Sequence, residues 1–329
     1  MRIGIDAMGG DGAPANNVGG ALAARDVIDE TDKIILIGQS DEIRKQLPDG
    51  QLPDYVEIVH ADQVVGMDEA PVDALRQKPN SSIAVMAEMH RDGKLDAIVS
   101  AGNTGACVAA AQMRLRRLPG VHRPGICILT PTYHGPVAVA DVGANVNCRP
   151  SHLHQYGVMA GEYMRAVVGV DSPRVGLLSI GEEDSKGNSL VKEAAALMRD
   201  DEDLNFIGNV EGRDLFRGIC DVMVCEGFVG NVVLKLMEGM AEGVLRGMFA
   251  ELTATLPAET HPAIKKSSMA LARKYDYNDY GGAPLLGVAG ILIICHGASN
   301  EIGIRNAVRV ARESVAHGIN SRITELLNK

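Results

Sequence analysis

The chain has 329 residues, of which 46% are hydrophobic and 22% charged, and its formal net charge is −10 at pH 7. A chain of this length and composition is typical of a globular enzyme with a substantial core. The acidic balance argues against a nucleic-acid partner, because phosphate backbones are bound by basic surfaces. Aromatic residues make up 3% and Trp is absent, so we expect an aliphatic interior with close backbone contacts at glycine.

Six cysteines are scattered without a Cys-x-x-Cys pair, and the strand-like run RIGID begins at the second residue with no signal peptide before it. These features predict a cytoplasmic location and thiols that are mostly core residues. Cys107, near the start of a predicted helix, is also interpreted as a core thiol. The longest apolar run, from Pro284, is too short and too rich in glycine to span a bilayer core of about 30 Å.

Short β-rich runs alternate with helical periodicity, for example RIGID, KIILIG, DAIVS and RVGLLSIG. This alternation predicts an α/β fold with a three-layer αβα arrangement around a largely parallel sheet. In such sheets ligands bind at the carboxyl ends of strands. We expect residues 1–329 to form a single catalytic α/β unit, either undivided or in two lobes around a cleft.

Two predicted helices carry glycine at four-residue spacing, Gly157 and Gly161 in one and Gly239, Gly243 and Gly247 in the other. Each glycine costs about 1 kcal/mol of helix propensity relative to Ala. The spacing therefore indicates a face pressed against another backbone. That backbone could belong to the same chain or to a second subunit.

Residues 253–280 depart from the βα rhythm and predict a helical excursion. Ile264, Met269 and Leu271 alternate there with cations such as Lys265 and Lys266. An apolar face bordered by cations is typical of membrane-surface contact. An ordinary amphipathic surface helix fits the same pattern.

The run DAIVSAGNTGACVAAA, residues 96–111, passes from a strand into an alanine-rich helix with almost no spacer. With Asn103 or Thr104 as N-cap, free amides at the helix start would favour an anion such as phosphate. A simple capped turn is the alternative. The candidate phosphate-binding residues are Ser100, Gly102, Asn103, Thr104 and Gly105.

The N-terminal turn DAMGGDGAPA offers a rival site, because Gly10-x-Gly12-x-x-Ala15 fits a degenerate dinucleotide fingerprint. Two acids would repel a pyrophosphate, Pro14 removes an amide donor, and the second strand ends in Gly38-Gln39 without an acid for a ribose. The turn is therefore weak support for a dinucleotide. Its cleft candidates are Asp6, Gly9, Gly10 and Asp11.

Two later turns carry candidate catalytic groups. In LLSIGEEDSKGNSL, residues 177–190, three acids precede Lys186, a cation suited to phosphate or an oxyanion and held charged by those acids. A salt bridge in a solvated loop is the alternative. In DVMVCEGFVGNVVLK, residues 221–235, Asn231 lies at a helix start, either as a cap or as an amide donor to a developing oxyanion.

The turns after Ala140 and Ile294 add Asp141, Asn145 and His296 as cleft candidates. Six such turns at one sheet edge would form a cleft lined with amide donors. No metal or serine-hydrolase motif is present, and His152 and His154 lie two residues apart on a predicted helix, which makes them poor co-ligands. We predict no metal and no cofactor.

The motifs DAMGGD, SAGNTGA, DVGAN, IGEEDSKGN, GNVEGRD, EGFVGNVVLK and GGAPLLG resemble, in order and spacing, the bacterial phosphate acyltransferases of phospholipid synthesis (the PlsX type). The resemblance covers essentially the whole chain. It implies a fold similar to phosphotransacetylases and isocitrate dehydrogenases. It also implies transfer of a long-chain fatty acyl group from acyl carrier protein to inorganic phosphate, which gives acyl phosphate for phosphatidic acid synthesis. One departure is Glu226, where the family often has Asp.

The resemblance implies catalytic roles for Lys186 and Asn231, with the GNTG turn as the phosphate seat. It further implies a homodimer, peripheral membrane contact through residues 253–280, and hand-over to a membrane glycerol-3-phosphate acyltransferase. Because carrier protein is acidic, we expect it to dock on a local basic patch. The run RLRRLPGVHR supplies that patch through Arg114, Arg116, Arg117 and Arg123, although a solvated charge run is the alternative.

Two other enzyme classes stay open. A short-chain phosphotransacetylase using acyl-coenzyme A would perform the same chemistry and differ in acyl length. An NAD-dependent dehydrogenase of related fold would require cofactor binding, against which the N-terminal acids argue.

Overall fold

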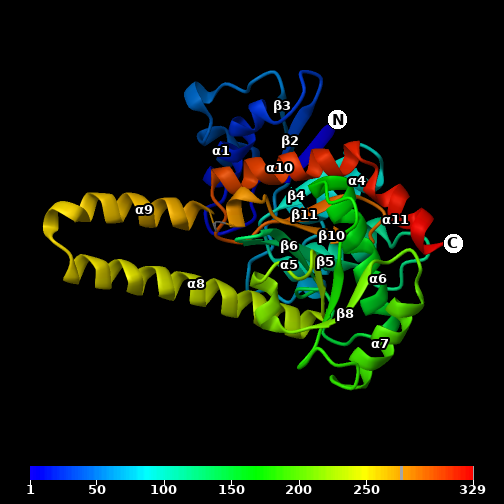
Figure 1. Cartoon of the computed structure of the whole chain (residues 1–329). Helices are drawn as coiled ribbons and strands as arrows, with labels where there is room; N and C mark the ends of the chain where they lie inside the picture. Colours follow the sequence, from blue (N-terminus) through cyan, green and yellow to red (C-terminus); the bar gives the residue numbers. More distant parts are fainter. Residues whose placement is uncertain (275–276, 329) are drawn as a thin grey trace.

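The computed structural model describes residues 1–274 and 277–328. Its centre is a sheet of eleven strands in the order β3-β2-β1-β4-β11-β10-β5-β6-β9-β7-β8, with helices on both faces (Figure 1). Alternate residues of one strand enter two separate cores: Ile34 and Leu36 pack on one face, Ile35 and Ile37 on the other. A strand buried on both faces reads as a continuous apolar run, and KIILIG does so. The predicted three-layer α/β fold is confirmed.

The first half of the sheet is entirely parallel. Its strands are β1 (Arg2–Asp6), β2 (Lys33–Gly38), β3 (Val56–His60), β4 (Ala97–Ser100) and β11 (Leu292–Ile294). The helices of this half are α1 (Ala15–Ala23), α2 (Ser40–Lys45), α3 (Pro71–Gln77), α4 (Ser82–Arg91), α5 (Thr104–Ala110) and α10 (Glu301–Ala316). A π-helical turn, Ala111–Leu115, extends α5.

The second half is a smaller parallel group. Its strands are β6 (Gly135–Ala140), β7 (Val175–Leu178), β8 (Phe206–Val210) and β9 (Val222–Val224). Its helices are α6 (Pro150–Tyr163), α7 (Ser189–Asp200), α8 (Gly227–Thr255), α9 (His261–Lys274) and α11 (Ile319–Leu327).

Two strands between the halves reverse the direction of the sheet. β10 (Ala283–Leu286) is antiparallel to β11 and to β5 (Gly125–Thr132), and β5 is antiparallel to β6. The strands of the two halves therefore point in opposite directions along the sheet. The six turns therefore do not meet at one edge of the sheet, because three successive antiparallel pairings reverse one half relative to the other.

The two glycine-spaced helices behave differently. On α6, a Cβ added to Gly157 would lie 3.3 Å from Val175 and 3.4 Å from Met198, so this glycine lets the helix approach the sheet. On α8, a Cβ added to Gly239, Gly243 or Gly247 would meet no described atom within 4 Å. Packing within the chain explains the α6 spacing and is wrong for the α8 spacing.

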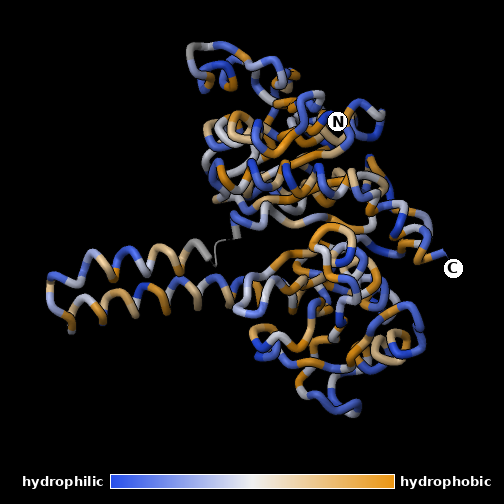
Figure 2. The backbone as a smooth tube through the Cα atoms, turned by 45° about the horizontal axis from the view of Figure 1, so that its top comes forward, coloured by the Kyte–Doolittle hydropathy of each residue, from blue (hydrophilic) through white to orange (hydrophobic). Residues whose placement is uncertain are grey.

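Helices α8 and α9 form a hairpin that projects from the body of the molecule (Figure 1). The excursion expected at residues 253–280 is thus the second arm of a longer structure that begins within α8; residues 275–276 lie outside the described ranges. Figure 2 shows hydrophobic and hydrophilic residues alternating along both arms. None of the helices in the described ranges is long and apolar enough to cross a membrane.

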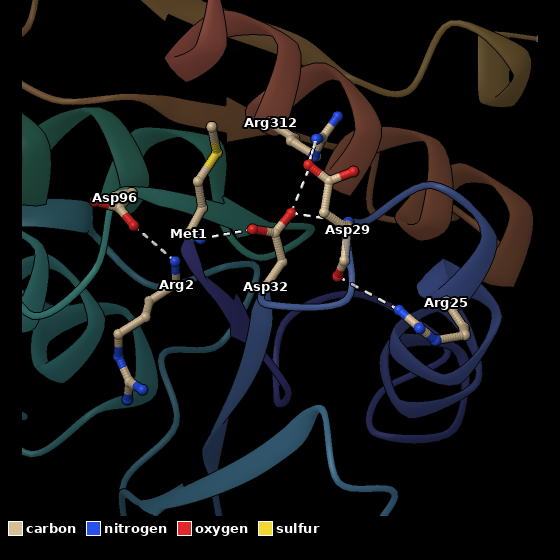
Figure 3. Close-up of polar contacts among 7 residues, drawn as sticks. All are labelled: Met1, Arg2, Arg25, Asp29, Asp32, Asp96 and Arg312. Atoms are coloured by element: carbon tan, nitrogen blue, oxygen red, sulfur yellow. Dashed lines mark hydrogen bonds and ion pairs between the residues drawn. The ribbon is translucent and has the colours of Figure 1, made fainter.

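A cluster of charges joins the first strand to the C-terminal part of the chain (Figure 3). The Met1 ammonium donates to Asp32 at 2.6 Å, and Arg312 on α10 donates to the same carboxylate at 2.9 Å. Burial raises the pKa of Asp32, but hydrogen bonds from the Met1 ammonium, the Asp29 amide and Arg312 outweigh it and hold the pKa below its usual value. The cluster fixes α10 against the first half of the sheet.

Candidate active site

The turns after β1 and β4 share a buried carboxylate. Asp6 is 1% exposed and accepts hydrogen bonds from the Ser100 hydroxyl at 2.7 Å and from the Met8 amide at 3.1 Å. Burial raises the pKa of Asp6. A Cβ on Gly9 would lie 2.6 Å from the Gly102 amide nitrogen, so glycine is required where the two turns touch. Asp6, Gly9, Ser100 and Gly102 therefore form one packed unit.

Asn103, one of the two residues predicted as the N-cap, caps α5. Its carbonyl oxygen accepts from the Ala106 amide at 3.0 Å, and its amide group donates to the carbonyl oxygens of Gly66, Met67 and Glu69. The side chain is thus fully occupied within the protein. The helix amides that lack an intrahelical acceptor at this end belong to Thr104 and Gly105, and Thr104 is exposed.

Cys107, one turn into α5, is 1% exposed, and burial raises its thiol pKa to about 12. It is a protonated core thiol at neutral pH, as predicted.

The turn after β11 is joined to the N-terminal turn. The Asp11 amide donates to the Gly297 carbonyl at 2.8 Å. Gly10 has φ +99°, and a Cβ added to it would lie 2.9 Å from that same carbonyl oxygen. Such a φ favours glycine. Gly10, Asp11 and His296 thus come together beside the Asp6 cluster. One amide of the dinucleotide-like turn, that of Asp11, is therefore already hydrogen-bonded within the protein.

In the second half, Asp141 plays the part that Asp6 plays in the first. It is fully buried and accepts from the amides of Ile126, Gly143, Ala144 and Asn145 at 2.7 to 3.2 Å. Burial raises the pKa of Asp141 against these hydrogen bonds, which lower it. Four amides on one carboxylate fix the course of the loop after β6.

Asn145 links that loop to its neighbours. Its side-chain amide donates to the Pro124 carbonyl at 2.6 Å and to the Tyr156 hydroxyl at 2.9 Å. Its main-chain carbonyl accepts from the Gly227 amide at 2.8 Å. Asp141 and Asn145 therefore support the site rather than face a ligand.

Glu226, and not Asn231, caps α8. The Glu226 carboxylate accepts from the amides of Phe228 at 2.7 Å and Val229 at 3.0 Å. The capping alternative for Asn231 is wrong. Asn231 is exposed on the second turn of α8, and its side chain makes no hydrogen bond within the described residues. A Cβ on Gly143 would lie 3.8 Å from its Cβ, so Asn231 borders the loop after β6.

Lys186 lies in the exposed loop between β7 and α7. The neighbouring acids do not pair with it: Asp184 contacts Arg199 at 2.7 Å and Glu182 contacts Arg213 at 4.0 Å. The alternative of a loop salt bridge is wrong for Lys186 among the described residues, because nearby arginines pair with two of the acids. Its ammonium has no ion pair among the residues that the structure describes.

Lys235 joins the two halves. Its ammonium lies 3.4 Å from Nε2 of His296, at the end of β11. Lys235 lies about two turns along α8 from its first residue, Gly227, or about 12 Å at 1.5 Å per residue. The length of α8 thus brings the oppositely directed strand ends into contact. Sequence reasoning missed Lys235, although its spacing of four from Asn231 puts both on one face of α8.

The four predicted docking arginines do not share one environment. Arg114 forms an ion pair with Glu88 on α4. Arg116, Arg117 and Arg123 are exposed and have no acidic partner in the described ranges. Arg116 has φ +67°, an uncommon value for a residue other than glycine.

Solved structures with the same fold include two phosphotransacetylases. The EutD phosphotransacetylase from Staphylococcus aureus gives a TM-score of 0.62 at 15% identity, and a phosphotransacetylase from Streptococcus pyogenes gives 0.63 at 16%. Each match covers 96% of this chain and 94% of the other. The fold class is that of the phosphotransacetylases.

Sequence comparison defines the family. The model of the family described as "Fatty acid synthesis protein" matches residues 1–322. The phosphate acyltransferase of Geotalea uraniireducens is 45% identical over 100% of this chain and 95% of its own length, and that of Desulforamulus reducens is 47% identical over 99% and 97%. The chain belongs to this phosphate acyltransferase family and is an acyltransferase.

Proposed function

We propose that the protein transfers a long-chain fatty acyl group from acyl carrier protein to inorganic phosphate and so forms acyl phosphate for phosphatidic acid synthesis. The observation that carries this proposal is the pair of polar side chains that stay free among the described residues, Lys186 and Asn231, at strand ends otherwise closed by internal hydrogen bonds. Full-length similarity to phosphate acyltransferases supports the same reaction.

The reaction needs positioning and charge stabilisation more than a protein nucleophile. A phosphate oxygen forms a bond to the thioester carbonyl carbon, and the carbon–sulfur bond then breaks with its electron pair on sulfur. Lys186 offsets the repulsion of the phosphate dianion, and Asn231 donates to the tetrahedral oxyanion. The amides of Thr104 and Gly105, at the positive end of α5, hold the phosphate. Ser100, Gly102 and Asn103 support this phosphate site by holding the turn before α5 in place.

The donor is expected to approach over the basic surface. Arg116, Arg117 and Arg123 form the docking patch for an acidic carrier protein. Arg114 is left out, because Glu88 neutralises it. The product passes to a membrane glycerol-3-phosphate acyltransferase.

The exposed side of α8 is the proposed subunit interface. Val232, Leu236, Met240 and Val244 recur every four residues and are 51% to 62% exposed, beside the open glycines of the same helix. An apolar stripe with small residues suits a second copy of the helix at close range. The functional unit is a homodimer in the cytoplasm.

The α9 arm of the hairpin is the proposed membrane contact. Met269 is 51% exposed and Leu271 37% exposed, next to Lys265 and Lys266. An amphipathic helix with cations at its border binds an anionic membrane surface peripherally.

The fold also suits a short-chain phosphotransacetylase, as the solved relatives are. Donor choice separates the two functions. The protein is mixed with phosphate and either palmitoyl carrier protein or acetyl-coenzyme A, and acyl phosphate is trapped as hydroxamate. We expect product from the carrier-protein donor. Product from acetyl-coenzyme A alone would replace this function with the short-chain one, and no product from a donor shown to be active would refute both.

A further inference from the structure

A basic pocket opens beside the start of α6, and its lining includes neither Lys186 nor Asn231. It is a cavity of about 480 Å³ lined by Arg117, Arg123, Arg149, His122 and His152, together with Asn147 and Ser151. A second hollow, lined in part by Arg116, shares Arg117 and Arg123 with it. The two hollows are therefore neighbours that share a basic wall.

The charge in this pocket is uncompensated. The chain has a net charge of −10, and most of its arginines pair with carboxylates. Arg117, Arg123 and Arg149 have no carboxylate partner in the part of the chain that is described, and no acid lines the cavity. The N-terminus of α6, a helix of 14 residues, adds its partial positive charge. Such a site attracts an anion.

The walls of the pocket are held in place by hydrogen bonds within the chain. Gln155, 6% exposed, accepts from the His122 amide at 2.8 Å and donates to the Gly120 carbonyl at 2.8 Å. The Arg117 guanidinium donates to the His122 carbonyl. His122 Nδ1 lies 3.1 Å from the Ser151 hydroxyl. The cations are thus presented by a prearranged loop, which lowers the cost of ordering them on binding.

His152 provides a directed donor. It is 8% exposed, and its Nδ1 accepts from the Arg149 amide at 3.1 Å, so the proton of the neutral ring is on Nε2. Burial lowers the pKa of His152, and the neighbouring Arg123 and Arg149 guanidinium groups lower it further. The neutral ring keeps its Nε2–H as a hydrogen-bond donor on a residue that lines the cavity.

The pocket is connected to the proposed catalytic residues by one loop. Residues 143–149 begin beside Asn231 and end at Arg149, and six residues span at most about 20 Å. Asn145, midway, is fixed to Pro124 and Gly227. A ligand seated here is therefore within reach of Asn231 along the loop, close enough to be tethered to the reacting carbonyl.

We infer that this pocket binds a phosphate ester and that its ligand is the phosphodiester of the pantetheine arm on which the carrier protein holds the acyl group. The assignment rests on the proposed function. The arginines bind the phosphate oxygens, and the arm runs along the loop after β6 toward Asn231. By fixing the phosphate end of the arm, the pocket positions the thioester at its other end.

Direct titration tests the site without any turnover. The full chain is titrated by calorimetry with 4′-phosphopantetheine and with pantetheine, which lacks the phosphate. We expect 4′-phosphopantetheine to bind at least about tenfold more tightly, and Arg149→Gln and Arg123→Gln to weaken it by about ten- to a hundredfold. Arg44→Gln, on α2, is the matched control and leaves binding unchanged. Equal binding of the two probes, or normal binding in Arg149→Gln, overturns the inference.

Kinetics distinguish the two sources of phosphate. If the pocket holds the donor arm, Arg149→Gln raises the KM for palmitoyl carrier protein and leaves the KM for inorganic phosphate unchanged. A raised KM for inorganic phosphate alone would make the pocket the seat of the nucleophile and overturn the assignment. Absence of turnover in the wild type would refute the proposed function, while the titration would still decide whether the pocket binds a phosphate ester.

Discussion

The turn after β1 and the turn after β6 are built alike but leave different groups free. Each centres on a buried aspartate, Asp6 or Asp141, that collects hydrogen bonds from its own loop and a neighbouring strand. In the first half the free donors are main-chain amides at the start of α5. In the second half they are two side chains, Lys186 and Asn231. The first region is suited to hold an anion, and the second to respond to charge that develops during reaction.

The largest effect should follow removal of the free side chains. Lys186→Ala and Asn231→Ala are each expected to lower the turnover rate by about 100 to 1,000 fold, as loss of one oxyanion donor does. Both residues are exposed, so the fold should persist. Steady-state acyl phosphate formation measures the rate, with Lys192→Ala, an exposed cation on α7, as control. Near-normal turnover in either variant contradicts the assignment.

The two aspartates should differ in their contribution to stability. Asp141→Asn removes one acceptor oxygen facing several amides that cannot turn away, and the expected loss is about 2–4 kcal/mol of unfolding free energy. Asp6→Asn should cost about 1–2 kcal/mol, because the Ser100 hydroxyl can rotate to accept from the new amide group. Urea unfolding followed by circular dichroism compares them. A larger loss at Asp6 would show that the two turns are not held as described.

Two glycines on α8 should respond with opposite signs. A Cβ on Gly230 would overlap the Asp141 carbonyl oxygen, so Gly230→Ala is expected to destabilise by about 1–3 kcal/mol. Gly239 faces open space, and Gly239→Ala should stabilise the isolated chain by about 0.5–1 kcal/mol. Thermal unfolding at low protein concentration checks both signs. Destabilisation by Gly239→Ala in the monomer would mean that its face packs within the chain.

A smaller effect concerns pH and the first half of the sheet. His90 Nδ1 lies 2.7 Å from the Leu95 carbonyl, and Nε2 accepts from the Ile291 amide at 2.9 Å, so the ring is needed in its neutral form. Burial lowers the pKa of His90. The unfolded chain therefore binds this proton more readily, and the free energy of unfolding should fall below about pH 6.5 by at most about 1.4 kcal/mol per pH unit.

Urea unfolding of the wild type and His90→Gln between about pH 5 and 8 tests this sign. The difference in stability between the two proteins should shrink as the pH falls below the ordinary pKa of histidine. A constant difference across the range would contradict the account of His90.

Much of the fold follows from local sequence. Buried parallel strands such as KIILIG are apolar on both faces, and the Asn103 cap follows from a polar residue between a strand and a helix. The reversal at β5 and β10 could not be predicted, because it depends on the pairing of residues as distant as Ile126 and Leu285. The direction of one half of the sheet, and hence the arrangement of the site, is a non-local property.

The sequence predicted individual candidate residues for the site, but not the contacts that their neighbours make in the folded chain. Lys186 and Asn231 were identified because each follows a strand and a glycine. The competition of Arg199 for Asp184, and the capping of α8 by Glu226, depend on side chains that only the folded chain brings together. Arg149 and His152 carried no motif, since their shared pocket arises from the loop after β6 meeting the segment before β5.

The most direct test of the site is a crystal structure of the protein with inorganic phosphate. The account predicts phosphate within hydrogen-bond distance of the Thr104 and Gly105 amides, on the side facing Lys186 and Asn231. Phosphate seated only in the Arg117, Arg123 and Arg149 pocket, with the start of α5 empty, would contradict the division of labour between the two halves.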